Sequence, residues 1–397
     1  MTYVLNNYLY ETSHKILDDC MSTTQISMVQ ATAVAPNITM SSNSFQTAML
    51  RNPEKEAKAR APLFLQLDKT KLKYLENLYN AGAKTSFEVE KELLLPKELL
   101  EPRILNLLTP AAIERIIRVN EKLLDKHIVV NVADALDMAI KNIVLDYPDL
   151  TNGIVILNDY TYAFTELDNH SGINRDLKKA LKSVQEQMVK SGIVDQKFSI
   201  GSIMTPYLPI PFEGSKLDYG TWGRPALIDT KIGIERLELT AALLKVKSIK
   251  RFGVRGKPQS GFWYKDVTEE VMSIAKNSGL DEGYALITTL HTTVGIIKMN
   301  PNDAEQFHDD LLFYAPDDPT QYYHNKLVRR GELKLRTDGR PLGDGNGGSH
   351  VKAALTGFYT VVPFKKGMLE IEDGERILQM DYDTLQPRER GVVVSLI

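Results

Sequence analysis

The chain has 397 residues, of which 43% are hydrophobic and 25% are charged, and its formal net charge is −3. This length allows two or three domains, and the composition is that of an ordinary soluble protein. A charge this close to neutral provides no broad basic field, so neither nucleic acid nor an anionic membrane is expected as the main partner.

The cysteine content and the apolar runs indicate where the protein resides. Its one cysteine, Cys20, excludes an intrachain disulfide and a cysteine-rich zinc site. The first residues lack a basic stretch followed by a long apolar run, and nowhere do 18 uncharged apolar residues follow one another. We therefore expect a soluble, cytoplasmic protein without membrane contact.

The N-terminal third divides into two segments. Residues 1–60 are expected to form a loosely ordered arm, because they are rich in Ser, Thr, Ala, Asn and Gln and show no sustained apolar period. Residues 61–124 are expected to be helical, with Ile113 and Ile117 on one face and Thr109-Pro110 as an N-cap and first-turn proline. No residue in either segment suggests chemistry.

The remainder mixes strands and helices and predicts an α+β fold with an antiparallel-rich sheet backed by helices. Residues 266–278 have a helical apolar period and lead into a strand that ends at His291. A second helix is expected at 303–314, followed by a long polar loop from 315 to 348. Short β-rich runs then continue to the last residue.

An internal repeat indicates two tandem modules, at 125–244 and 245–397. Residues 207–229 and 359–381 match without a gap at a spacing of 152 residues, with six identities in 23 positions. The matched pairs are Tyr207/Tyr359, Pro211/Pro363, Phe212/Phe364, Leu217/Leu369, Arg224/Arg376 and Asp229/Asp381. The alternative is that two unrelated α+β stretches match by chance, and we favour duplication.

Three motifs in the second module carry a family resemblance. They are HTT at 291–293, YYHN at 322–325 and SHVKAAL at 349–355. With them, residues from about 245 to 397 resemble the YjbQ family. The resemblance implies a compact α+β module, a trimer-like homo-oligomer and an activity of the thiamine-phosphate-synthase kind.

The two modules depart from the family pattern in complementary ways. The second has Asn300 in place of an acidic residue and 372–375 in place of a GTWQ turn, whereas the first keeps Gly220-Thr221-Trp222 and the acidic Asp168. The first module lacks the histidines, since Phe198 stands opposite His350, and Asp159 or Thr161 stands opposite His291. We therefore hypothesise one composite site, in which the turn of the first module closes the pocket of the second.

The histidines allow two kinds of chemistry. His291, His324 and His350 can hold Zn²⁺ or another divalent metal and leave one position for water or substrate. Without metal, the same imidazoles and Thr292 can act as acid, base or phosphate partners. The plainest alternative is that each histidine only donates to a backbone carbonyl. His308, on a helix beside two aspartates, is expected on a solvated face.

The glycine-rich segment 342–349 gives an indication of the ligand's charge. With Gly347, Gly348 and Lys352, and with Asn325 of the YYHN motif, it can cradle an anion through backbone N–H groups, although so many glycines more often form a mobile loop. A small phosphorylated ligand is favoured. The basic run 245–257 is a candidate RNA-binding patch, but we favour a strand with solvated charges, which makes nucleic acid an unlikely partner.

The sequence thus leads to two hypotheses. The first is a metal-assisted or acid–base enzyme, or binding protein, for a small phosphorylated metabolite. The alternative is a catalytically inactive pseudoenzyme that acts as a structural or assembly subunit, which the departures at Asn300 and 372–375 favour.

Overall fold

The computed structural model describes residues 69–90, 129–130, 133–158, 162–168, 172–190, 204–214, 216–229, 236–256, 262–330, 345–383 and 388–397. The arm predicted at 1–60 and most of the helical segment predicted at 61–124 lie outside these residues. So do Asp159, Thr161 and Phe198, which were matched to the histidines of the second module.

The first half of the described chain contains two antiparallel sheets. A five-stranded sheet has the order β1-β8-β3-β5-β6, and a three-stranded sheet has the order β2-β7-β4. The strands are β1 (Ala83–Glu90), β2 (Val129–Val130), β3 (Asn152–Asn158), β4 (Tyr162–Asp168), β5 (Tyr207–Glu213), β6 (Lys216–Leu217), β7 (Gly223–Asp229) and β8 (Arg236–Lys245). The helices are α4 (Lys69–Ala81), α7 (Ala133–Leu145) and α8 (Ile173–Lys190).

The second half has the same plan. Its sheets have the orders β14-β13-β11-β16-β9 and β10-β15-β12. The strands are β9 (Ser248–Arg255), β10 (Trp263–Asp266), β11 (Glu282–Thr289), β12 (Val294–Met299), β13 (Tyr359–Lys365), β14 (Met368–Leu369), β15 (Arg376–Asp381) and β16 (Glu389–Leu396). The helices are α9 (Thr268–Lys276), a 3₁₀ turn η4 (Pro301–Asp303), α10 (Ala304–Tyr314), α11 (Tyr323–Arg330) and α12 (Gly347–Thr356).

The strand orders of the two halves agree position by position. When β1, β8, β3, β5 and β6 are matched to β9, β16, β11, β13 and β14, both five-stranded sheets read identically, and the three-stranded sheets match in the same way. Matched strands β5 and β13 begin at Tyr207 and Tyr359, which are the first residues of the internal repeat. The α+β class predicted from the sequence is confirmed.

Two predictions of local structure were wrong. Residues 83–90, expected to be helical, form strand β1, which pairs along its whole length with β8. The alternation in Thr-Ser-Phe-Glu-Val-Glu has the period of a strand, and Phe87 packs against the apolar core. The loop expected at 315–348 contains helix α11 and the start of α12.

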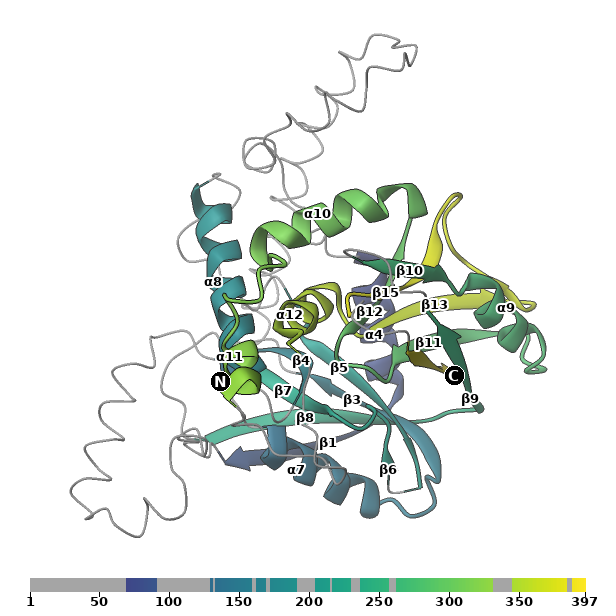
Figure 1. Cartoon of the computed structure of the whole chain (residues 1–397). Coiled ribbons are helices and arrows are strands. Elements are labelled where there is room, and N and C mark those ends of the chain that lie inside the picture. The colour runs from purple at the N-terminus through teal and green to yellow at the C-terminus, as the bar shows by residue number, and fades with distance from the viewer. Residues whose placement is uncertain are drawn as a thin grey trace, which may run out of the picture.

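Packing joins the two halves into one core. One apolar cluster contains Leu286, Tyr359 and Val361 of the second half together with β3, β5 and β8 of the first half. A second cluster joins α8 of the first half to α10 and α12 of the second. Figure 1 shows these three helices on one side of the molecule, with the sheets behind and below them. No helix among the described residues is long and apolar enough to span a membrane.

Candidate functional site

His291 lies in a tight turn between β11 and β12. Its backbone N–H donates to Thr289 Oγ1 at 3.3 Å, and its carbonyl oxygen accepts from Val294 N at 3.2 Å. Burial, together with the nearby charges of Arg390 and Arg388, lowers the pKa of His291 to about 4, and the charge of Asp383 partly opposes this decrease. The imidazole is therefore neutral at pH 7.

His324 and His350 lie next to each other on α11 and α12. Both are buried, and their ring centroids are 5.3 Å apart with the rings nearly edge to face. His350 Nδ1 lies 3.1 Å from the backbone oxygen of Thr292, which ties α12 to the turn that carries His291. This contact to a backbone oxygen is of the kind that a purely structural histidine makes.

Asp176 on α8 of the first half holds the start of α11 in place. Its carboxylate accepts hydrogen bonds from the backbone N–H groups of Tyr323, at 2.7 Å, and His324, at 3.0 Å. Burial raises the pKa of Asp176, while these two bonds oppose the increase. An anionic side chain at the start of α11 also interacts favourably with the helix dipole. The first half thus fixes where α11 begins.

The turn 220–222 of the first half contacts the His291 turn directly. Gly220 has φ +76°, and a Cβ built on it would lie 2.0 Å from the backbone oxygen of Leu290. Only glycine permits this approach. Trp222 is 37% exposed, and Asp168 lies beside the turn because its backbone pairs with Gly223 in the β4–β7 ladder. The structure therefore places Gly220 against the residue that precedes His291.

The glycine-rich segment is the start of a helix rather than a loop in its described part. Gly347 and Gly348 lie buried in the first turn of α12, and the Gly347 N–H donates to Asn325 Oδ1 at 2.8 Å. Asn325 Nδ2 donates to the backbone oxygen of Pro319 at 2.9 Å, so this side chain braces α11 against α12.

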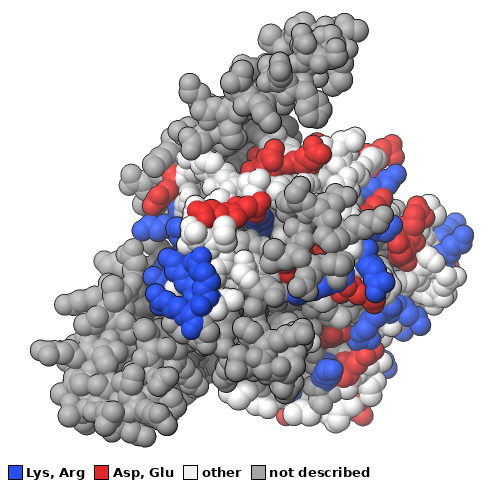
Figure 2. Space-filling view, in the orientation of Figure 1, with Lys and Arg blue, Asp and Glu red and all other residues white. Residues whose placement is uncertain are grey.

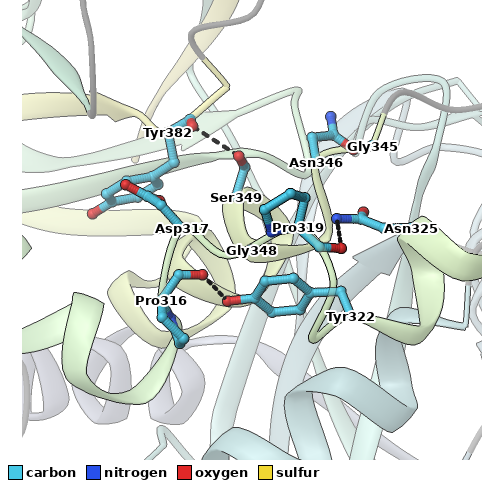
Figure 3. Close-up of a pocket in the computed structure, with 10 residues that line it drawn as sticks. All are labelled: Pro316, Asp317, Pro319, Tyr322, Asn325, Gly345, Asn346, Gly348, Ser349 and Tyr382. Atoms are coloured by element: carbon cyan, nitrogen blue, oxygen red, sulfur yellow. Dashed lines mark hydrogen bonds between the residues drawn. The ribbon is translucent and has the colours of Figure 1, made fainter.

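A cavity of about 180 Å³ lies at this end of α12 (Figure 3). Its lining includes Asn325 and Gly348, together with Pro316, Asp317, Pro319, Tyr322, Gly345, Asn346, Ser349 and Tyr382. None of the three histidines is among the described residues that line it. The predicted ligand residues are thus divided between this cavity and the region around the histidines.

Lys352 and His308 are placed differently from what the sequence suggested. Lys352 is 1% exposed, and its ammonium donates to Asp317, so it is a buried ion-pair partner and not an open phosphate ligand. His308, expected on a solvated face, is 4% exposed and stacks on Phe262 with ring centroids 4.1 Å apart. The helical period of α10 misled the prediction because Phe262, outside that helix, covers the face where His308 lies.

A buried charge cluster near His291 was missed. Arg390 is 1% exposed and donates from Nε and Nη2 to both carboxylate oxygens of Asp381, at 2.6 and 2.9 Å. Arg388 lies 3.5 Å from Asp383. The sequence repeat could have pointed to Asp381, because this residue is matched to Asp229. It could not have pointed to the two arginines, because they lie outside the matched segment. The sequence did not predict a role for Asp176, because the charged residues of its helix are typical of a solvated helix.

The predicted metal centre does not fit the described residues. No group of three or more His, Cys, Asp or Glu side chains within the described ranges has a geometry that can hold a metal ion. His291 also lies in the field of two guanidinium groups, which lower its pKa and repel a divalent cation in the same way.

The molecular surface near the site is locally basic. Figure 2 shows a blue patch over α11, whose exposed basic residues are Lys326, Arg329 and Arg330. Arg175 of α8 adds a guanidinium 4.4 Å from the ring centroid of Tyr323. This patch stands on the helix that carries His324, and it attracts anions despite the negative net charge of the chain.

Comparisons with known proteins agree with the motifs. The sequence model of the family described as UPF0047 protein YjbQ-like matches residues 254–397. A UPF0047 protein of Archaeoglobus fulgidus is 28% identical over 134 residues, which make up 33% of this chain and 89% of that protein. The resemblance of the second half to this family is confirmed.

Solved structures are similar over the same share of the chain. A YjbQ/UPF0047 family protein of Clostridium acetobutylicum is 23% identical and covers 37% of this chain and 99% of its own, with a TM-score of 0.30. A YbjQ-like protein of unknown function from Sulfolobus solfataricus is 21% identical and covers 38% and 96%, also with a TM-score of 0.30.

Proposed function

With its second half YjbQ-like, we propose that this protein binds and transforms a small phosphorylated metabolite at a single site that both halves build around His291, His324 and His350. The contact of Gly220 with Leu290 carries this proposal, because it puts the turn kept by the first half against the histidine turn kept by the second. Asp176 supports it by fastening α11 from the same side.

The histidines have distinct roles in this proposal. His291 is neutral at pH 7, so its imidazole can accept a hydrogen bond from a ligand. The oxygen of Thr292 can only accept, so His350 carries a proton on Nδ1, and this bond fixes the orientation of its ring. Arg388 and the basic residues of α11 supply the positive field that a phosphoryl group requires. The family resemblance implies a thiamine-phosphate-synthase-like reaction as one member of this class.

Phosphate binding tests the ligand class. We expect inorganic pyrophosphate to bind the purified protein in isothermal titration calorimetry, and Arg388→Gln to weaken this binding about tenfold. The matched control is Lys276→Gln, which removes one exposed positive charge at the end of α9. Equal affinities in both variants would show that the binding is only a response to net charge.

Metal analysis tests the acid–base interpretation against the metal one. We expect the purified protein and its His291→Ala/His350→Ala variant to hold equally little metal, measured by mass spectrometry after exchange into metal-free buffer. Zinc near one equivalent per chain in the wild type, lost in the variant, would instead assign the histidines as metal ligands.

The second candidate is an inactive structural subunit, and two observations favour it. Asn300, which replaces an acidic residue, has a structural task, because its Oδ1 accepts from Asn302 N at 3.0 Å. Glu375, in the turn that replaces GTWQ, pairs with Lys298 at 2.6 Å. Absence of pyrophosphate binding, together with unchanged folding of the double histidine variant, would support this candidate.

A further inference from the structure

The two halves contact each other through unlike surfaces. The three described atoms nearest to a Cβ built at Gly220 of the first half all belong to Leu290 of the second half. In the corresponding turn of the second half, 372–375, Glu375 pairs with Lys298 of the same half. Among the described residues, the one atom within 4 Å of a Cβ at Gly374 is Asn300 Nδ2, at 3.4 Å. Such head-to-tail contact leaves one surface of the second half uncovered by the first.

Two matched tyrosines show what covers that surface. The Tyr359 hydroxyl donates to the backbone oxygen of Tyr207 at 2.6 Å, so the second half covers the start of β5. The matched oxygen, on Tyr359 at the start of β13, accepts instead from Lys71 Nζ of helix α4, also at 2.6 Å. The same ammonium lies 4.1 Å from the centroid of the Tyr359 ring. On the first half, the start of β5 is covered by the second half. On the second half, the matching start of β13 is covered by helix α4.

The apolar face of α4 packs against β11 and β13 of the second half. Leu75 and Leu78 are 0% and 3% exposed, and they belong to the cluster that also contains Tyr359 and Val361 of β13. Tyr74 packs on Tyr284 of β11 with ring centroids 5.6 Å apart. Figure 1 shows α4, in purple, behind the strands of the second half. The helix covers apolar and hydrogen-bonding groups of β11 and β13 together, as a protein partner would.

We propose that α4 is an intramolecular substitute for a second copy of this chain. It covers the β11–β13 surface of the second half and closes the head-to-tail arrangement within one molecule, so that the full chain is a monomer. When α4 is displaced, this surface binds the first half of another copy, because that contact continues the one already present between the halves. The homo-oligomer implied by the family resemblance is then replaced by a closed single chain. This proposal does not depend on the proposed function.

Sedimentation velocity over a wide concentration range tests the proposal. We expect the full-length wild type to have the mass of one chain, 44.6 kDa, at every concentration. The variant Lys71→Glu/Leu75→Asp, which disrupts the inner face of α4, should form dimers or larger species. Lys73→Glu, an exposed charge reversal on the same helix, should remain a monomer.

Two results would overturn the proposal. One is a wild-type chain that is itself a stable oligomer. The other is a variant with native circular dichroism that stays monomeric at the highest concentration. If the double variant does not fold, Lys71→Ala decides the question, because it removes the ammonium that contacts Tyr359 and leaves the apolar face of α4 intact. It must then self-associate at least tenfold more strongly than Lys73→Glu for the proposal to stand.

Discussion

At the scale of single residues, burial determines how the histidines behave. His291 and His308 both have a pKa lowered to about 4, in each case mainly because burial disfavours the charged imidazole. The charge of Lys352 contributes to the lowered pKa of His308, and the charge of Asp317 opposes this decrease. His308 Nε2 is buried without a hydrogen-bond partner among the described residues. Protonation of this ring in the folded state is therefore costly.

His308 predicts a pH dependence of stability. Its folded-state pKa, about 4, lies below the ordinary histidine value of 6.5, so its contribution to stability is complete above pH 6.5 and is lost as pH falls toward 4. We expect the free energy of unfolding to decrease by up to about 3 kcal/mol from this group alone over that range. His308→Phe keeps the ring stacking and should remove this part of the decrease. Urea unfolding at pH 7.0 and 5.0 measures it, and an equal decrease in both proteins would contradict the assignment.

Single residues also show the limits of sequence reasoning. The motifs identified His291, His324 and His350 because they are local patterns, and the structure brings His324 and His350 together. The ion pair of Lys352 with Asp317 and the stacking of His308 on Phe262 depend on side chains distant in the chain. No local pattern contains this information.

At the scale of elements, the sequence identified those with a clear period. The helices α9 and α10 and the strands β11, β13, β15 and β16 lie where the periodicity predicted them. Helix α11 was missed because it is short and its first N–H groups are capped by Asp176, which is 147 residues away from Tyr323. Strand β1 was missed because its partner β8 lies far along the chain.

The start of α11 provides a prediction at this scale. Asp176→Ala should lower the free energy of unfolding by about 1–3 kcal/mol, because one buried and one partly buried N–H group lose their acceptor. Asp176→Asn should cost less, since one oxygen remains to accept. Thermal unfolding measures both, with the exposed Asp146→Asn at the end of α7 as the control. A loss in Asp146→Asn as large as in Asp176→Ala would indicate a nonspecific effect of charge.

At the scale of the whole molecule, the central claim is that the two halves build one site between them. The sequence comparison predicted a composite site, but only the structure could show the spatial contact between Gly220 and Leu290. Gly220→Ala should lower the free energy of unfolding by about 2–4 kcal/mol, from backbone strain and from displacement of Leu290. Gly214→Ala is the matched control. Its φ is +58° but nothing lies within 4 Å, so strain of about 1 kcal/mol is its whole cost.

The most direct measurement of this claim is the NMR titration of the His291 imidazole in the wild type, Gly220→Ala and Gly214→Ala. We predict that the ring stays neutral down to about pH 5 in the wild type and in Gly214→Ala, because its folded-state pKa is about 4. In Gly220→Ala, displacement of Leu290 should admit water to the turn and raise the pKa of His291 toward 6.5. A His291 titration in Gly220→Ala that matches the wild type would contradict a site completed by the first half.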